Sequence, residues 1–258
     1  MGMIMNNVNT AHVHPSITPT NRAQIYEHFF SHVPSPSANT PPICTIIGGG
    51  VAAGKNTLRQ KLFDDGVISH TMHLHDPDAV IQMLSGYKDQ IHEITADMTM
   101  DTDTKMAHMG ALFGQWDPVA RAMAVEMRNH ALSQRCDILF ERTLAIPEDY
   151  DFIARVRDAG YHIKLYGIYS HPDQAFERAQ YRALKIGRYI ARDIIEDRTQ
   201  KFRAMWGKYN QLADQAILFD NSGTYGAFPV IYERAGNTET IHMADIYRDF
   251  DTSNYQKS

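Results

Sequence analysis

The sequence predicts an α/β protein with a largely parallel β-sheet, helices on both faces of the sheet and a small C-terminal β-hairpin. Short apolar segments alternate with helix-forming segments from residue 43 onward, as in sheets whose parallel strands are joined by helices. The first apolar segment, residues 43–47, leads into a glycine-rich loop and then a helix-forming segment. Near the end, residues 229–234 and 239–243 flank Ala-Gly-Asn, which indicates a hairpin.

Each element is predicted from its local pattern. Apolar or alternating segments predict strands at residues 43–47, 71–75, 137–140, 161–169 and 216–219. Helical patterns predict helices at residues 21–32, 58–63, 147–159, 172–184 and 191–213, and another that opens at Asp76. Asp117-Pro118 predicts the start of a further helix ending near Gln134, because an acidic cap followed by proline is a typical helix start. Residues 88–116 show no clean pattern, and we expect a loop and one helix there.

Composition limits the class of protein. The chain has 258 residues, 43% of them hydrophobic, which is enough for one large domain with an arm. We expect a flexible arm with one helix and a proline-rich linker at residues 1–42, an α/β domain at 43–250 and a tail at 251–258. A net charge of −5 without a long basic run argues against nucleic acid and anionic membranes as partners. The two cysteines lie in apolar segments, which predicts buried, reduced thiols. Because the sequence also shows no secretory signal and no apolar run long enough to cross a bilayer, we expect a cytoplasmic protein.

The strongest motif lies between the first strand and the helix that follows it. The spacing Gly49-x4-Gly54-Lys55 fits the phosphate-binding P-loop, in which glycines let backbone N–H groups point at phosphate oxygens. The start of the helix adds its positive end, and Lys55 would reach the outer phosphates. The residues expected to bind ATP are Gly49, Gly50, Val51, Ala52, Ala53, Gly54, Lys55, Asn56 and Thr57. The alternative is a glycine-rich turn without a ligand.

The residue after Lys55 departs from the P-loop template. Asn56 stands where the template has Ser or Thr, and Thr57 comes one residue later. The hydroxyl at that position holds Mg²⁺ in most P-loops, so the amide oxygen of Asn56 would replace it as a weaker, neutral ligand. We therefore expect ATP and Mg²⁺ as cofactors, with the geometry of the metal depending on Asn56.

Polar residues follow two other predicted strands. The sites of open parallel sheets lie at the carboxyl ends of their strands, so these residues are expected to converge on the P-loop. Asp76 is interpreted as a general base for a substrate hydroxyl or as a partner of Mg²⁺, with Asp78 as the second choice and helix capping as the alternative. Glu141 is expected to bind substrate or to support magnesium. Arg142 and Thr143 stand at the same edge, and they are expected to bind substrate together with Asp78 and Arg182.

The chain carries four cations between Arg178 and Arg188. A solvated helix face is the common explanation of such a run. Arg178 and Arg182 share one helix face at four-residue spacing, so a bound anion would relieve their repulsion. Gly187 then breaks the helix and would let Arg188 move as part of a lid. Phosphoryl transfer spreads negative charge over the moving group, so these arginines predict a charge-stabilising role.

Three histidines, His70, His73 and His75, precede Asp76 and raise the alternative of a metal site. His73 and His75 would share one face of their strand, but no further ligands are spaced to complete a zinc site. We expect these histidines to be packed or hydrogen-bonded strand residues.

Taken in order, these motifs resemble the zeta-toxin-like P-loop kinases over roughly residues 43–235. The resemblance rests on Ile47–Thr57, Leu74-His75-Asp76-Pro77-Asp78 with Gly86-Tyr87 downstream, Leu139-Phe140-Glu141-Arg142-Thr143, Ala159-Gly160-Tyr161, the arginine segment and Leu218-Phe219-Asp220-Asn221-Ser222. It implies a P-loop NTPase-type fold and an ATP-dependent kinase, with Asp76 as the base and Lys55 as the P-loop lysine. It also implies lid arginines, for which Arg178 and Arg188 fit best and Arg182 is a further candidate.

The resemblance also concerns the acceptor and the partners. Family members often have Gly at the position of Arg142, and their usual acceptor is a UDP-linked amino sugar. The added cation in this chain would suit an acceptor that carries phosphate, such as a nucleotide or dinucleotide. A nucleotide sugar stays among the expected acceptors. A toxin or effector role and an antitoxin or chaperone partner are implied by resemblance alone, and the proline-rich arm is compatible with delivery into a host cell. The alternatives are a nucleotide-binding interaction protein without catalysis, which Asn56 favours, and a metabolic nucleoside or antibiotic kinase.

Overall fold

The computed structural model describes residues 16–35, 40–186 and 190–251, so residues 1–15 and 36–39 of the expected arm and residues 252–258 of the expected tail lie outside the described residues. The chain divides into two compact units. The first contains the described residues up to Ile25 and the segment Pro77–Met123, and the second contains Tyr26–Asp76 and the chain from Ala124 onward.

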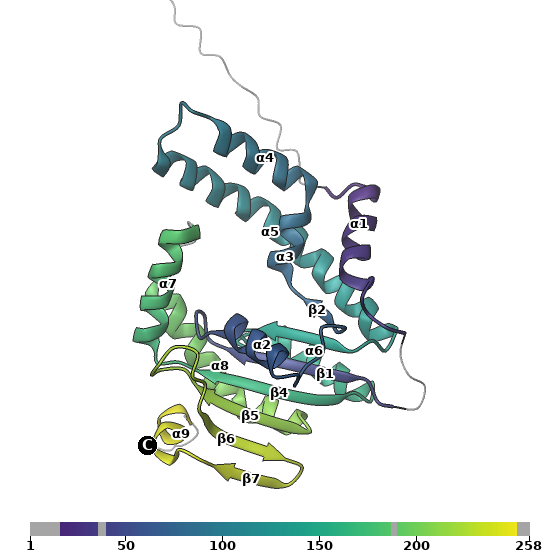
Figure 1. Ribbon diagram of the computed structural model, residues 1–258, viewed down its shortest axis with the longest axis vertical. Helices are drawn as coiled ribbons and strands as arrows, with labels where there is room; N and C mark the ends of the chain where they lie inside the picture. The colour runs from purple at the N-terminus through teal and green to yellow at the C-terminus, as the bar shows by residue number, and fades with distance from the viewer. Residues whose placement is uncertain (1–15, 36–39, 187–189, 252–258) are drawn as a thin grey trace, which may run out of the picture. The chain divides into compact units, whose positions relative to one another are not determined.

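The second unit is built on a seven-stranded sheet, drawn with labelled arrows in Figure 1. Its strands are β1 (Ile43–Gly49), β2 (His73–His75), β3 (Ile138–Arg142), β4 (His162–Tyr169), β5 (Gln215–Asp220), β6 (Val230–Ala235) and β7 (Thr238–Ile241). Their order in the sheet is β2-β3-β1-β4-β5-β6-β7. The pairs from β2 to β5 are parallel, and β5, β6 and β7 are antiparallel. The predicted fold class and the C-terminal hairpin are therefore confirmed.

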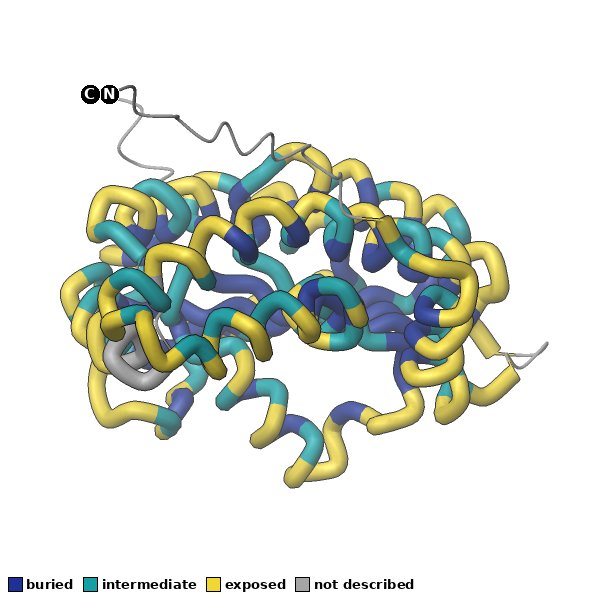
Figure 2. Tube along the Cα trace, turned by 90° about the horizontal axis from the view of Figure 1, so that it is seen from above, coloured by how far each residue is buried: buried dark blue, intermediate teal, exposed yellow. Residues whose placement is uncertain are grey.

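Helices cover both faces of this sheet. They are α2 (Lys55–Asp64), α6 (Pro147–Asp158), α8 (Arg192–Leu212) and α9 (Ala244–Phe250), while α7 (Pro172–Ile186) packs on α8 and on the loop that follows β1. Neighbouring residues of a strand point to opposite faces, so Ile47 packs with Leu58 of α2, whereas Ile46 packs in the cluster that contains Phe202 of α8. Figure 2 shows the strands as a buried layer between these helices. Cys44 and Cys136 are buried and free, as expected.

The first unit is helical. It contains the first part of α1 (Pro19–Phe30), α3 (Pro77–Met83), α4 (Ser85–Ala96) and the N-terminal part of α5 (Thr102–Ser133). The Asn21 side chain connects α1 to the next two helices, because it donates to the Met83 carbonyl at 2.9 Å and accepts from the Ser85 N–H at 3.1 Å. A Cβ at Gly86 would lie 2.6 Å from the Trp116 ring, so glycine there permits close packing of α4 on α5.

The predicted helix start at Asp117-Pro118 is wrong. Pro118 lies inside α5, which already begins at Thr102, and α4 adds a second helix where a loop was expected. Proline removes one hydrogen bond from a helix and crowds the carbonyl four residues earlier. That residue is Gly114, whose lack of a side chain gives its peptide more freedom to tilt. Asp117 bonds along the helix to Arg121 at 2.7 Å instead of marking a helix start.

The C-terminal helix α9 is absent from the elements that the sequence predicts. Its seven residues are too few to show a helical period. Phe250 is buried with its ring 5.9 Å from those of Phe202 and Trp206, so tertiary packing stabilises this short helix.

Two strand histidines are buried at the β2 edge of the sheet. His73 is fully buried, and its ring stacks on Phe30 of α1 with centroids 4.6 Å apart. Burial lowers the pKa of His73 to about 4. Burial also lowers the pKa of His75 well below its ordinary value, with Arg128 and Arg142 adding to the effect. Both histidines are packed strand residues, as expected.

The second unit should therefore lose stability in acid. Unfolded histidine titrates near pH 6.5, so between about pH 6.5 and pH 4 the unfolded chain binds more protons and stability falls as pH falls. The lowered pKa of His73 corresponds to roughly 3 kcal/mol lost by pH 4. Urea unfolding of His73→Phe across this range should show a shallower pH dependence than wild type. The same slope in both proteins would contradict this, and His92→Phe at an exposed position is the matched control.

Candidate active site

The loop between β1 and α2 is shaped by its glycines. A Cβ at Gly49 would lie 2.8 Å from the Ile168 carbonyl oxygen, and one at Gly50 would collide with the Thr199 hydroxyl. Gly54 has a φ of +105°, a left-handed conformation that glycine adopts without steric cost. Ala52 also has a positive φ, of +57°, which residues other than glycine rarely adopt. The loop has the compact backbone that close approach to phosphates requires.

Lys55 is the first residue of α2, and its ammonium group lies over this loop. Its Nζ donates to the carbonyl oxygens of Gly49 and Gly50 at 3.1 and 2.9 Å. The neighbouring Asn56 is exposed in the first turn, whereas the Thr57 hydroxyl lies 2.6 Å from the Tyr225 hydroxyl. In this turn Asn56 is thus the more exposed side chain, and the metal role expected of it stays a prediction.

Arg178 on α7 is fixed close to the same loop. It donates to the Ser170 hydroxyl at 3.2 Å and to the Asn221 carbonyl at 2.6 Å, and its guanidinium lies 4.8 Å from the Tyr225 ring centre. Burial lowers its pKa, with Tyr225 and Asp220 opposing the effect. Both of these hydrogen bonds go to neutral oxygens, so they leave the positive charge of Arg178 available to an anion.

Asp76 stands at the carboxyl end of β2, and α3 begins at the next residue, Pro77, as predicted. In the sheet order, β3 alone separates β2 from β1, which sets the two strands about 10 Å apart. His75 pairs with Phe140, which pairs with Ile46, so β1 continues three residues beyond the level of β2 before it ends at Gly49. The two strand ends are therefore about 14 Å apart. The Asp76 side chain is half-buried. Asp78 is exposed in the first turn of α3 and belongs to the first unit. Its expected role in substrate binding stays a prediction.

Glu141 follows Phe140 on β3 and faces the α2 side of the sheet. It forms an ion pair with Arg59 of α2 at 3.1 Å, with both side chains largely buried. The sequence pattern does not predict Arg59, because nothing in the spacing relates it to β3. The pair places a carboxylate at the end of the strand between β1 and β2, next to half-buried Thr143.

Arg142 points to the opposite face of the sheet from Glu141. Its Nε bonds to Asp149 of α6 at 3.1 Å, and Asp149 is 1% exposed. Burial raises the pKa of Asp149, and the positive charge of Arg142 opposes that shift. The cation that the sequence suggests for an acceptor pocket therefore has a structural partner, which no sequence pattern indicates. Its contact with an acceptor stays a prediction.

Two of the predicted arginines are not placed. Arg188 lies outside the described residues, and Arg182 is described only as part of the backbone of α7. Their expected roles over the transferring group stay predictions.

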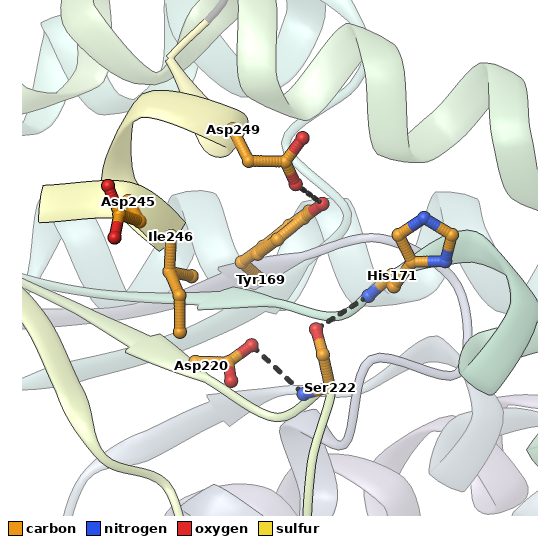
Figure 3. Close-up of a pocket in the computed structure, with 7 residues that line it drawn as sticks. All are labelled: Tyr169, His171, Asp220, Ser222, Asp245, Ile246 and Asp249. Atoms are coloured by element: carbon orange, nitrogen blue, oxygen red, sulfur yellow. Dashed lines mark hydrogen bonds between the residues drawn. The ribbon is translucent and has the colours of Figure 1, made fainter. Parts of the chain in front are cut away.

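A cavity of about 290 Å³ opens beside the ends of β4 and β5 (Figure 3). Its lining includes three carboxylates, those of Asp220, Asp245 and Asp249, and the Tyr169 hydroxyl, which donates to Asp249. Tyr169 and Asp220 face the α8 side of the sheet, opposite Phe219 and the α2 cluster. Its acidic lining and its position distinguish this cavity from the phosphate loop.

A mostly parallel sheet whose first strand leads through a glycine-rich loop and lysine into a helix defines a P-loop kinase-type fold. The sequence matches the family model for Zeta toxin over residues 27–229, which is most of the chain. The chain therefore belongs to the Zeta toxin family, which supports a phosphotransferase that uses ATP.

Solved structures agree with this fold. One, from the PezAT chromosomal toxin–antitoxin system of Streptococcus pneumoniae, is 17% identical with a TM-score of 0.62, covering 92% of this chain and 89% of that one. Another is AvrRxo1-ORF1:AvrRxo1-ORF2 with sulphate ions, 12% identical with a TM-score of 0.63, covering 90% and 71%. The same complex with ATP has a TM-score of 0.62 at 12% identity, covering 90% and 71%. No curated protein matches the chain.

Residues 16–35, 40–186 and 190–251 contain no helix with both the length and the apolar character needed to span a bilayer. Within the same ranges, no group of three His, Cys, Asp or Glu side chains is arranged to hold a metal ion.

Proposed function

We propose that this protein transfers the γ-phosphate of ATP to a hydroxyl of a nucleotide, a dinucleotide or a nucleotide sugar, and that it acts as a toxin or effector. One observation carries the proposal. The loop that carries Lys55 and the carboxylate of Asp76 end two parallel strands of one sheet, with only β3 between them. A separation of about 14 Å leaves room for the end of a triphosphate and an acceptor hydroxyl.

The chemistry follows from these positions. The acceptor hydroxyl would lose its proton to Asp76 as its oxygen attacks the γ-phosphorus, and the bond from that phosphorus to the β–γ bridging oxygen would break to release ADP. Lys55 would exchange its carbonyl contacts for the outer phosphates, and Arg178 would stabilise the charge on the moving group. The amide oxygen of Asn56 would hold Mg²⁺, which supplies charge neutralisation on the phosphates, and Asp76 would support the ion only through the outer shell, so that its carboxylate stays available for the proton.

A second candidate function, a nucleotide-binding interaction protein without catalysis, is favoured by one observation. Asn56 replaces the usual metal-binding hydroxyl, and the Thr57 hydroxyl is bonded to Tyr225. Incubation of the protein with ATP, Mg²⁺ and a panel of nucleotides, dinucleotides and nucleotide sugars, read by mass spectrometry, separates the two candidates. A product heavier by one phosphoryl group supports the kinase, and ATP binding without such a product on any acceptor supports the binding protein.

The acceptor panel also tests Arg142. Arg142→Lys keeps the charge beside Asp149 but loses the guanidinium fork, so it avoids leaving a buried carboxylate unpaired. If Arg142 reads a phosphate of the acceptor, the KM for phosphate-bearing acceptors should rise roughly tenfold, while the KM for ATP stays unchanged. If Arg142→Lys leaves the KM for every acceptor at its wild-type value, the role of Arg142 is limited to its ion pair with Asp149.

A protein partner follows from the family rather than from the geometry. One of the similar structures comes from a toxin–antitoxin system, and another is a two-protein complex. We propose that an antitoxin or chaperone neutralises this protein in the cell that makes it, and that it acts in the cytoplasm of that cell or of a host cell. Co-purification of the product of a neighbouring gene, with loss of transferase activity in the complex, would support this.

A further inference from the structure

We propose that Asn221 is a positioning residue that holds the phosphate loop and Arg178 in a single arrangement suited to ATP. Asn221 is the first residue after β5 and is 1% exposed. The rule that selects Asp76 and Glu141, a polar residue at the carboxyl end of a strand, applies equally to Asn221. This inference rests on the proposed function, because it concerns the same ATP site.

The side chain of Asn221 joins two loops. Its Nδ2 donates to the Ala53 carbonyl of the phosphate loop at 2.8 Å, and its Oδ1 accepts from the Gly226 N–H at 3.1 Å. A Cβ at Gly54 would collide with this Nδ2, so the amide lies directly against the last glycine of the phosphate loop. Only a side chain with both a donor and an acceptor can make these two contacts at once.

The backbone of Asn221 joins two further parts of the site. Its N–H donates to the Tyr169 carbonyl at the end of β4 at 2.8 Å, and its carbonyl accepts from Arg178 at 2.6 Å. All four polar groups of this buried residue are thus used. A displacement of Asn221 would move the anchor of Arg178 together with the anchor of the phosphate loop.

The loop that Asn221 holds through Gly226 completes the arrangement. It carries Tyr225, whose hydroxyl lies 2.6 Å from that of Thr57 and whose ring faces the Arg178 guanidinium. The start of α2, Arg178 and the phosphate loop are therefore linked through one amide. Because a bound triphosphate would contact the loop and Arg178 at once, their relative position should set its affinity.

Two substitutions test this role. Asn221→Asp is nearly isosteric and keeps the acceptor for Gly226, but it replaces the donor to Ala53 with an oxygen that repels the carbonyl. Asn221→Ala removes both contacts. The Kd for Mg²⁺-ATP, measured by calorimetry on protein shown to be folded by circular dichroism, should rise about tenfold or more in Asn221→Ala and further in Asn221→Asp.

Asn210→Ala is the matched control. Asn210 also bridges two elements by side-chain bonds, to Tyr232 at 2.7 Å and from Arg234 at 2.8 Å, but it stands in the last turn of α8. It should lower the melting temperature and leave the Kd for ATP unchanged. If both Asn221 variants also lower the melting temperature and leave the Kd for ATP unchanged, Asn221 has a structural role only and the inference is overturned.

A double-substitution cycle tests the link to Arg178. Arg178→Lys should weaken ATP binding in the wild-type chain and have a several-fold smaller effect in Asn221→Ala. The alanine keeps the backbone carbonyl that accepts from Arg178, but without the side-chain contacts to Ala53 and Gly226 that carbonyl is no longer held in place relative to the phosphate loop. Equal effects in both backgrounds would overturn the inference. Failure of the wild-type chain to bind ATP would overturn the proposed function as well, whereas normal ATP binding by both Asn221 variants would overturn the inference alone.

Discussion

Asp76→Asn should reduce phosphoryl transfer by roughly 10²- to 10⁴-fold while ATP still binds, because an amide cannot accept the proton of the acceptor hydroxyl. The substitution keeps the size of the side chain at the start of α3, so the fold should be retained. Transfer is measured as phosphorylated acceptor under single-turnover conditions, and binding is measured by calorimetry.

Two comparisons make this result specific. Asp64→Asn, at the exposed end of α2 where the carboxylate bonds only to Gln60 in the described contacts, should transfer at the wild-type rate. Asp78→Asn tests the second choice for the base. If Asp78→Asn abolishes transfer and Asp76→Asn does not, the base has been assigned to the wrong carboxylate.

Lys55→Ala should weaken ATP binding by about 10- to 100-fold and slow transfer by a further 10²- to 10³-fold, because it removes the ammonium group that would contact the outer phosphates. Lys61→Ala is the matched control, since Lys61 is an exposed lysine of the same helix that pairs with Asp65. Binding is followed by calorimetry and transfer by phosphorylated acceptor.

The same pair of variants tests the toxin role in cells. Induced expression of the wild-type chain and of Lys61→Ala should arrest growth, and expression of Lys55→Ala should not. Normal growth with the active wild-type protein would favour a metabolic kinase, and arrest by Lys55→Ala would mean that toxicity does not depend on ATP.

The parts of the fold that the sequence predicts well are those in which local pattern and tertiary structure agree. Apolar β1 runs into its glycine loop, and Gly160, with a φ of +77°, ends α6 as expected. Local pattern and tertiary structure disagree in the long helix α5. Proline usually stands at the start of a helix, but Pro118 lies inside α5, four residues after Gly114. Short α9 depends on the burial of Phe250, a long-range contact that no local window contains.

The candidate site shows the same division. Lys55, Asp76 and Glu141 can be found from the sequence because the carboxyl ends of parallel strands meet at one edge. Asn221 could have been found by the same rule applied to β5. Arg59 and Asp149 could not, because their roles depend on which side of the sheet a neighbouring strand residue faces and on which helix covers it.

A structure of the protein with Mg²⁺ and a non-hydrolysable ATP analogue tests the central claim most directly. We expect the triphosphate in the loop from Gly49 to Thr57, with Lys55 on its outer phosphates. The carboxylate of Asp76 should face the γ-phosphate, with space for one hydroxyl between them. A nucleotide bound elsewhere on the protein, or a γ-phosphate turned away from Asp76, would contradict it.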